Sequence, residues 1–172
     1  TATILSGTGL PLDFGLQTTA GVYTVVGVNP LTTCSSNMSG SATITVNPLP
    51  PLCSVTGGGS FCAGSAGLHV GLMCSSPGIS YQLLLDGVPL GAPIMGTGLA
   101  LDFGLQSAAG TYTVVATNTV TGCSRTMGGS AIMIVNPLPA PIGGPTAVCP
   151  GSDITVTDAT PGGTWTSSSP GI

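Results

Sequence analysis

The stretch Gly96–Pro139 reads GTGLALDFGLQSAAGTYTVVATNTVTGCSRTMGGSAIMIVNPLP, and a near copy, Gly7–Pro50, reads GTGLPLDFGLQTTAGVYTVVGVNPLTTCSSNMSGSATITVNPLP. The two copies are offset by 89 residues without a gap, and about 29 of 45 aligned positions (6–50 against 95–139) are identical. Self-similarity at a fixed period indicates an architecture built from one repeated structural unit. The 89-residue step therefore decides how the chain divides.

This step divides the chain into three segments. Residues 1–50 match the C-terminal part of the repeat, residues 51–139 hold one complete repeat, and residues 140–172 resemble the N-terminal part of a further repeat. In the last segment Trp165 aligns with Tyr81. The sequence thus predicts one whole repeat, the central segment, flanked by two partial repeats, the N-terminal and C-terminal segments.

The two outer segments are complementary. On the same alignment Ile172 corresponds to Val88 and Thr1 to Leu90, so the segments together make almost one repeat, divided near the Asp86-Gly87 hairpin. Two interpretations remain open: the chain is a window of a long array, or its partial repeats are completed by neighbouring copies. In both cases we expect the unit to continue, because a partial sheet leaves open strand edges that favour pairing with another chain.

Short apolar runs that alternate with polar residues predict β-strands, and the Gly and Pro clusters between them predict turns. The central segment is expected to form strands at Leu68–Met73, Tyr81–Leu85, Pro93–Met95, Leu99–Phe103, Gly110–Ala116 and Ala131–Val135. We interpret Thr56–Ser60 as a flexible glycine turn and Asn136–Pro139 as a stiff, Pro-rich joint between repeats. The apolar periodicity of a helix is missing. The predicted fold class is all-β.

Charged side chains are nearly absent. They make up 3% of the 172 residues, namely Arg125 and five aspartates, with no Lys and no Glu, against about 25% in a typical soluble domain. Clustered Lys and Arg, which phosphate binding requires, are missing, so no nucleic-acid partner is expected. No apolar run reaches the roughly 20 residues of a membrane-spanning helix. Low net charge promotes association between copies.

Six cysteines in a chain of this composition indicate an oxidising, extracellular location. The repeat positions suggest a pairing of Cys62 with Cys123 inside the complete repeat and of Cys34 with Cys149 between neighbouring units. Cys53 and Cys74 are both missing from the aligned C-terminal segment, which suggests that they pair with each other. The alternatives are free buried thiols or a metal site. A zinc site is not supported, because the sequence has no CxxC spacing and a single histidine, His69.

The remaining motifs indicate no chemistry. Both copies contain the kinase tripeptide Asp-Phe-Gly, but kinase catalysis needs a lysine, which this chain lacks. His69 has no triad spacing and is interpreted as an exposed structural residue. Calcium binding requires six or more oxygen ligands close together. The aspartates that could contribute are scattered along the sequence and form no such group: Asp86, Asp102 and Asp153. We expect no catalytic, cofactor or metal site, and one possible glycosylation site at Asn37, in an Asn-Met-Ser sequon.

The motifs after Cys62 resemble a known family. Tyr81-Gln-Leu-Leu-Leu-Asp-Gly, Gly110-Thr-Tyr-Thr-Val, Thr121-Gly-Cys123 and the closing Ile-Val-Asn-Pro are similar to the Ig-like or PKD-like repeats of large bacterial surface proteins. The resemblance is closest to adhesins and gliding-motility proteins of Bacteroidetes, and it covers the whole chain. It implies tandem Ig-like β-sandwich repeats of about 89 residues, joined at the Asn-Pro-Leu-Pro sequences.

The expected function is structural. We interpret the chain as a subunit or repeat window of a self-assembling, disulfide-stiffened filament, secreted or held at the cell surface, whose partners are further copies of itself. The alternative is the repeat stalk of a bacterial adhesin that binds glycans or surfaces. Enzymatic activity is not expected in either case, and fold alone does not decide between the two.

Overall fold

The protein is built from β-strands. The structure, a computed structural model, describes residues 3–168, and within that range it contains fourteen strands and no helix. The all-β prediction is therefore confirmed. The two chain ends that the sequence alignment places beside the Asp86-Gly87 hairpin, Thr1 and Ile172, lie outside the described residues. No helix long and apolar enough to span a bilayer occurs in the described part of the chain.

Ten strands of the central segment form two sheets. The larger sheet has the order β10-β8-β12-β14-β6, with β9 added beside β8 and β13 beside β12, and the smaller has the order β11-β7-β5. The larger sheet consists of β6 (Gly59–Cys62), β8 (Ile79–Leu85), β9 (Val88–Pro89), β10 (Ile94–Met95), β12 (Gly110–Asn118), β13 (Ser124–Thr126) and β14 (Ala131–Asn136). The smaller consists of β5 (Val55–Gly57), β7 (Leu68–Leu72) and β11 (Leu101–Gln106). Strand pairing is antiparallel except between β14 and β6.

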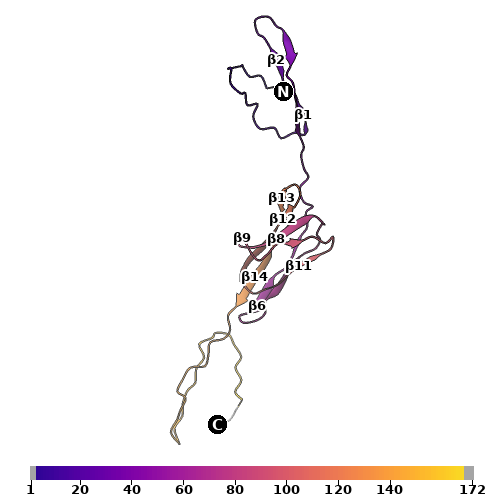
Figure 1. Ribbon diagram of the computed structural model, residues 1–172. Coiled ribbons are helices and arrows are strands. Elements are labelled where there is room, and N and C mark those ends of the chain that lie inside the picture. The colour runs from indigo at the N-terminus through magenta and orange to yellow at the C-terminus, as the bar shows by residue number, and fades with distance from the viewer. Residues whose placement is uncertain (1–2, 169–172) are drawn as a thin grey trace.

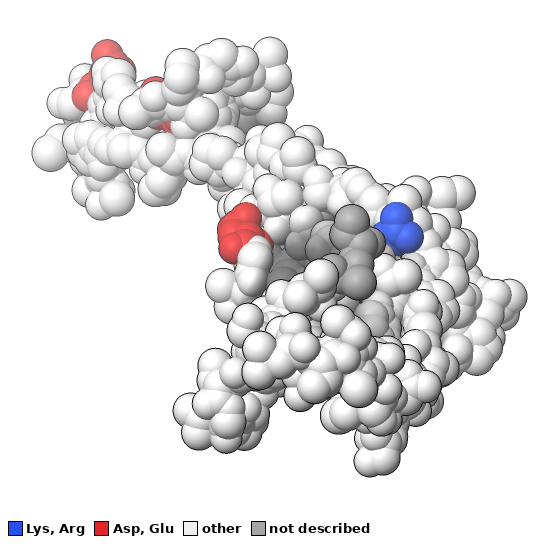
Figure 2. Space-filling model, turned by 90° about the horizontal axis from the view of Figure 1, so that it is seen from above, with Lys and Arg blue, Asp and Glu red and all other residues white. Residues whose placement is uncertain are grey.

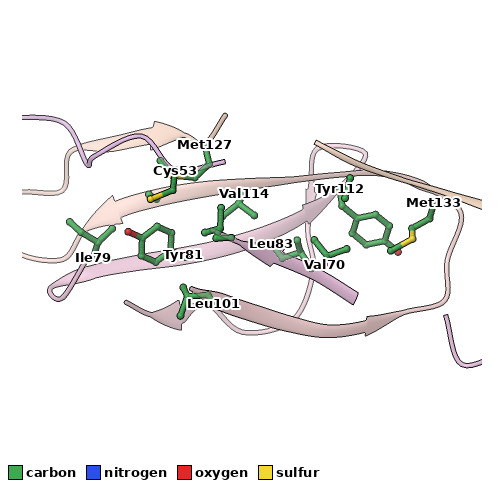
Figure 3. Close-up of a cluster of buried hydrophobic side chains, with 13 residues drawn as sticks. Cys53, Val70, Ile79, Tyr81, Leu83, Leu101, Tyr112, Val114, Met127 and Met133 are labelled. Carbon is green, nitrogen blue, oxygen red and sulfur yellow. The ribbon is translucent and has the colours of Figure 1, made fainter. Parts of the chain in front are cut away.

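One hydrophobic core lies between the two sheets. Because side chains alternate across a strand, every second residue of β12 points inward, and Tyr112, Val114 and Ala116 are all fully buried. From the smaller sheet, Val70 and Leu72 pack against them. Figure 3 shows Val70, Tyr112 and Val114 between the ribbons. Each buried aliphatic or aromatic side chain stabilises the fold by roughly 1.5–3 kcal/mol, so this face-to-face packing holds the central segment together.

The predicted strands of the central segment are confirmed, with small shifts of their ends. One strand start was wrong: Leu99 was expected to begin a strand, but it precedes β11 and its side chain is exposed. The glycine turn at Thr56–Ser60 was also wrong, because this stretch contains parts of two strands, β5 and β6. The predicted hairpin is present, with Asp86 and Gly87 both at positive φ between β8 and β9.

The glycines of this stretch carry the chain from the smaller sheet to the larger one. Gly57 pairs with β7 in the smaller sheet, and Gly59 pairs with β14 in the larger sheet. Between them, a Cβ on Gly58 would lie 2.8 Å from the carbonyl oxygen of Ile132, and one on Gly57 would overlap the carbonyl group of His69. Glycine is needed because two backbones pass too close for any side chain.

The disulfide Cys53–Cys74 joins the start of the central segment to the loop that follows β7, across 21 residues. Cys53 is buried in the core cluster, and its carbonyl oxygen accepts a hydrogen bond from the amide of Gly128. Pro50, the last residue of the first joint, is also fully buried. The chain is therefore fastened where it enters the sandwich.

The outer segments extend away from opposite ends of the sandwich (Figure 1). The N-terminal segment contains two separate two-stranded pairs, β1–β4 and β2–β3. Their bounds are β1 (Gly21–Tyr23), β2 (Val26–Val28), β3 (Ser35–Asn37) and β4 (Ala42–Ile44). The described part of the C-terminal segment holds one isolated antiparallel bridge, between Gly143 and Thr157.

Candidate assembly interface

The N-terminal segment has the local structure of the second half of the central repeat. β1 pairs with β4 in the register in which β12 pairs with β14, and β2 pairs with β3 in the register in which β12 pairs with β13. At the 89-residue offset, Gly21 opposite Ile44 reproduces Gly110 opposite Met133. The repeated sequence therefore produces the same strand pairing without the rest of a sandwich around it.

Side-chain hydrogen bonds are reproduced as well. The hydroxyl of Tyr23 donates to the carbonyl oxygen of Thr19 over 2.9 Å, as the hydroxyl of Tyr112 donates to that of Ala108 over 2.9 Å. These bonds are local, between residues four apart in sequence. Local contacts thus keep the half-repeat close to the conformation that it has in a complete unit.

The N-terminal segment lacks the strand that should lie beside β1 and β2. In the central repeat β8 pairs with β12 from Tyr112 to Asn118, on the side away from β13 and β14. In the N-terminal segment the corresponding run, residues 23–29, has no strand on that side among the described residues. An unpaired row of backbone N–H and C=O groups is a template for another strand.

The core face of this half-repeat is uncovered. Val25 is 38% exposed, whereas its counterpart Val114 is 0% exposed. Met38 is 49% exposed, whereas Met127 is 3% exposed. The same residue types at the same repeat positions thus differ only in whether a facing sheet covers them. The N-terminal segment presents an apolar surface that the central repeat keeps inside.

The C-terminal segment reproduces part of the first half of the repeat. A Cβ on Gly144 would meet the carbonyl oxygen of Thr155, as one on Gly57 would meet that of His69, so Thr155 has the place of His69. The next residue, Val156, has the place of Val70. This match makes the Gly143 bridge the counterpart of the β5–β7 pairing.

The apolar side chains of the C-terminal segment are exposed too. Val156 is 58% exposed against 0% for Val70, and Trp165 is 54% exposed against 0% for Tyr81. Val156 and Trp165 line one shallow depression together with Ile142. The two ends of the chain therefore each present half of a core, and the halves are different.

Two kinds of turn carry the four cysteines outside the disulfide. The early turn reads Cys-x-Gly-Ser: the carbonyl oxygen of Cys62 accepts from the amide of Ser65, and that of Cys149 accepts from Ser152. The late turn starts at an asparagine: the amide of Asn118 donates to the carbonyl oxygen of Cys123, as that of Asn29 does to Cys34. Each outer segment thus holds one turn, in the geometry seen in the complete repeat.

The predicted bridge between Cys62 and Cys123 is wrong, because both thiols are free. Cys62 ends β6 and Cys123 precedes β13, and these two strands lie at opposite ends of the sandwich (Figure 1). Cys62 is in register with Asn136, beyond the Gly110 end of β12, and Cys123 follows the Asn118 end. The eight steps of β12 span about 26 Å at roughly 3.3 Å per residue, whereas a disulfide needs Cα atoms within about 7 Å. The predicted Cys53–Cys74 pair is present. Cys34 and Cys149 are free in the single chain.

The other residues singled out from the sequence lie on the surface. Asn37 is exposed on β3, in a position open to a glycan. His69 is exposed as expected, but it has a partner that the sequence did not indicate, because its Nδ1 lies 2.8 Å from Oδ2 of Asp102 on the neighbouring strand β11. This hydrogen bond, together with one from the amide of Gly104, lowers the pKa of the Asp102 carboxyl. Among the described residues no three His, Cys, Asp or Glu side chains converge on a common point.

Charged side chains are rare on the surface of the molecule. Figure 2 shows red groups in a few places and a single blue group on an otherwise uncharged face of the molecule. Charged residues make up 3% of the chain, with a formal net charge of −4. Charge therefore contributes little to either repulsion or attraction between this protein and other molecules.

Comparisons with family models, with curated proteins and with solved structures find no match to this chain.

Proposed function

We propose that this protein is the structural subunit of an extracellular filament of Ig-like repeats. In the filament, residues 140–172 of one copy join residues 1–50 of the next copy and complete a repeat that resembles the central one. Each subunit then contributes two repeats to the filament, one whole and one shared. In this proposal, each exposed half of the core is covered by another copy of the same chain.

The observation that carries the proposal is the exposure of both halves of the core at matching repeat positions. Val25 and Met38 on one end, and Val156 and Trp165 on the other, occupy positions whose counterparts are 0–3% exposed in the central repeat. Exposed apolar surface of this kind marks an interaction site. The facing surfaces come from complementary parts of one repeat, which a second copy supplies and an unrelated partner does not.

The sizes of facing residues agree with this pairing. In the central repeat Ala116 lies opposite Tyr81. The corresponding residues of the shared repeat are Gly27 and Trp165, so a smaller residue faces a larger one. Residues directly opposite in neighbouring strands have Cβ atoms about 5 Å apart and share one packing space. Gly27 is one methyl group smaller than Ala116, and Trp165 has a larger ring than Tyr81, so the two differences compensate each other.

Electron microscopy of the purified 172-residue chain tests the proposal. We expect unbranched filaments whose axial period equals two repeats, because each subunit contributes one whole and one shared repeat. A chain that stays monomeric in native solution at high concentration would contradict the proposal.

A matched pair of variants makes the test specific. Val156→Asp places a charge on the core side of the C-terminal segment, and we expect it to abolish filaments. Thr155→Asp places the same charge one residue away, at the position of the exposed His69, and filaments are expected to persist. Equal behaviour of the two variants would show that the apolar face of this segment is not the assembly surface.

A further inference from the structure

Two of the four free cysteines, Cys62 and Cys123, lie beside the joints at the two ends of the central repeat. At the exit of the central repeat, Cys62 is in register with Asn136, and the carbonyl oxygen of Asn136 accepts a hydrogen bond from the amide of Ala63 over 2.8 Å. At the entry, the thiol of Cys123 lies 3.9 Å from the carbonyl oxygen of Asn47. An early-turn cysteine therefore marks the exit of a repeat, and a late-turn cysteine marks its entry.

Asn47 and Asn136 are the same position of the repeat. Each begins an Asn-Pro-Leu-Pro joint, and they are 89 residues apart. At a joint between two complete repeats, this one carbonyl oxygen therefore contacts both turns: the amide that follows the early cysteine of the preceding repeat, and the thiol of the late cysteine of the following repeat. Because both turns approach the same oxygen, the two cysteines lie close together, and a disulfide requires Cα atoms about 4.4–6.8 Å apart. The geometry suits a bridge across the joint.

We infer that the early cysteine of each repeat forms a disulfide with the late cysteine of the repeat that follows. The inference rests on the proposed function, because the shared repeat supplies the missing partners. Cys62 of one copy then pairs with Cys34 of the next copy, and Cys149 pairs with Cys123 of the next copy. Both bridges are intermolecular, and together they use all four free thiols.

The chemistry is thiol–disulfide exchange with a small disulfide oxidant. A thiolate of one cysteine attacks the oxidant and releases one thiol, and the second cysteine then attacks the mixed disulfide and releases the other. Two protein thiols are oxidised to one disulfide, and one oxidant disulfide is reduced to two thiols. Cys34, Cys62 and Cys149 are exposed, so a small oxidant reaches one partner of each bridge.

Two double variants with the same number of thiols test this pairing. The proteins are assembled under mild reductant, checked for filaments by electron microscopy, oxidised with glutathione disulfide, and run on a denaturing gel without reductant. Cys34→Ser/Cys62→Ser removes both partners of one bridge and keeps Cys123–Cys149, so a ladder of covalent polymers is expected. Cys62→Ser/Cys123→Ser removes one partner from each bridge, so only monomer is expected.

Pairing within repeats predicts the reverse result. If Cys62 paired with Cys123 and Cys34 with Cys149, the first variant would lose the ladder and the second would keep it. That reversal, or filaments in which all four thiols still react with a thiol reagent after oxidation, would overturn the inference while leaving the proposed filament intact. If no variant and no wild-type sample forms filaments under reductant, the proposed function itself fails. The microscopy and the gel thus separate the two failures.

Discussion

Ala116 lies directly opposite Tyr81 where β12 pairs with β8, and neither side chain is accessible to solvent. This pair shows how tightly the large sheet is packed on its inner face. In the shared repeat that we propose, the corresponding residues are Gly27 and Trp165. The size of residue 27 should therefore control how well two copies fit together.

Gly27→Leu is expected to weaken assembly. Gly27 lies in strand β2 without a positive φ, so leucine is compatible with the backbone there. The added side chain would compete with Trp165 for one space, and overpacking of this kind costs about 1–3 kcal/mol, or roughly a 5- to 150-fold loss of association. Light scattering against concentration measures this. The control is Val28→Leu, at an exposed neighbour on the opposite face, and an equal loss in both variants would contradict the predicted pairing.

Removal of the disulfide should destabilise the central repeat. Cys53→Ser/Cys74→Ser opens a loop of 21 residues, and the chain-entropy model gives a loss of about 3 kcal/mol for a loop of this size. Denaturant unfolding measures the free energy, in a Val156→Asp background so that assembly does not contribute. Cys62→Ser, at an exposed thiol, should change it by less than about 0.5 kcal/mol. Equal stability of the two proteins would show that the bridge is not structural.

Two buried tyrosines should respond differently to loss of the hydroxyl group. The hydroxyl of Tyr81 accepts a hydrogen bond from the half-buried amide of Ser76 over 2.9 Å. Tyr81→Phe leaves that donor without its partner, at a cost of about 1–3 kcal/mol. The hydroxyl of Tyr112 donates to Ala108, which is exposed and can bond to water instead. Tyr112→Phe should therefore cost less in the same unfolding measurement, and the opposite order would contradict this account of the core.

The Asp102 carboxyl should titrate below its ordinary pKa because of His69 and the amide of Gly104. A lowered folded-state pKa means that the unfolded chain binds the proton more tightly. The contribution of the carboxylate to stability is thus present above the unfolded pKa of about 4 and is lost as pH falls through the folded value. In an NMR titration, His69→Ala should raise the pKa of Asp102. An unchanged pKa would mean that the imidazole contact does not persist in solution.

The central repeat shows which parts of the fold the sequence predicts and which part it does not. The alternation of apolar and polar residues in Gly110–Ala116 indicated which side chains are buried. Successive side chains of a strand point to opposite faces of the sheet, and only the face with Tyr112 and Val114 meets the core. The passage of the chain from one sheet to the other at Gly57 was missed, since a run of glycines predicts a turn equally well. Whether this stretch forms a turn or two strands depends on how closely β7 approaches Gly57 and β14 approaches Gly58, which is a tertiary property.

One cysteine pairing was predicted correctly from the sequence, and another was not. Spacing suggested that Cys53 and Cys74 occur together, and they are bonded. Pairing Cys62 with Cys123 assumed that two cysteines of one repeat lie close together, whereas β12 separates them by its whole length. Only the structure shows that each lies beside an Asn-Pro-Leu-Pro sequence, Cys62 in register with Asn136 and Cys123 in contact with Asn47. Sequence position alone carries no information about which end of a sandwich a turn occupies.

The fluorescence of Trp165, the single tryptophan of the chain, tests the central claim most directly. Its side chain is 54% exposed in the isolated chain, and in the shared repeat it takes the buried place of Tyr81. As filaments form, we predict that its emission shifts to shorter wavelength and that acrylamide quenching falls, with both changes absent in Val156→Asp. Filaments in which Trp165 keeps the emission and quenching of the monomer would contradict completion of one copy by the next.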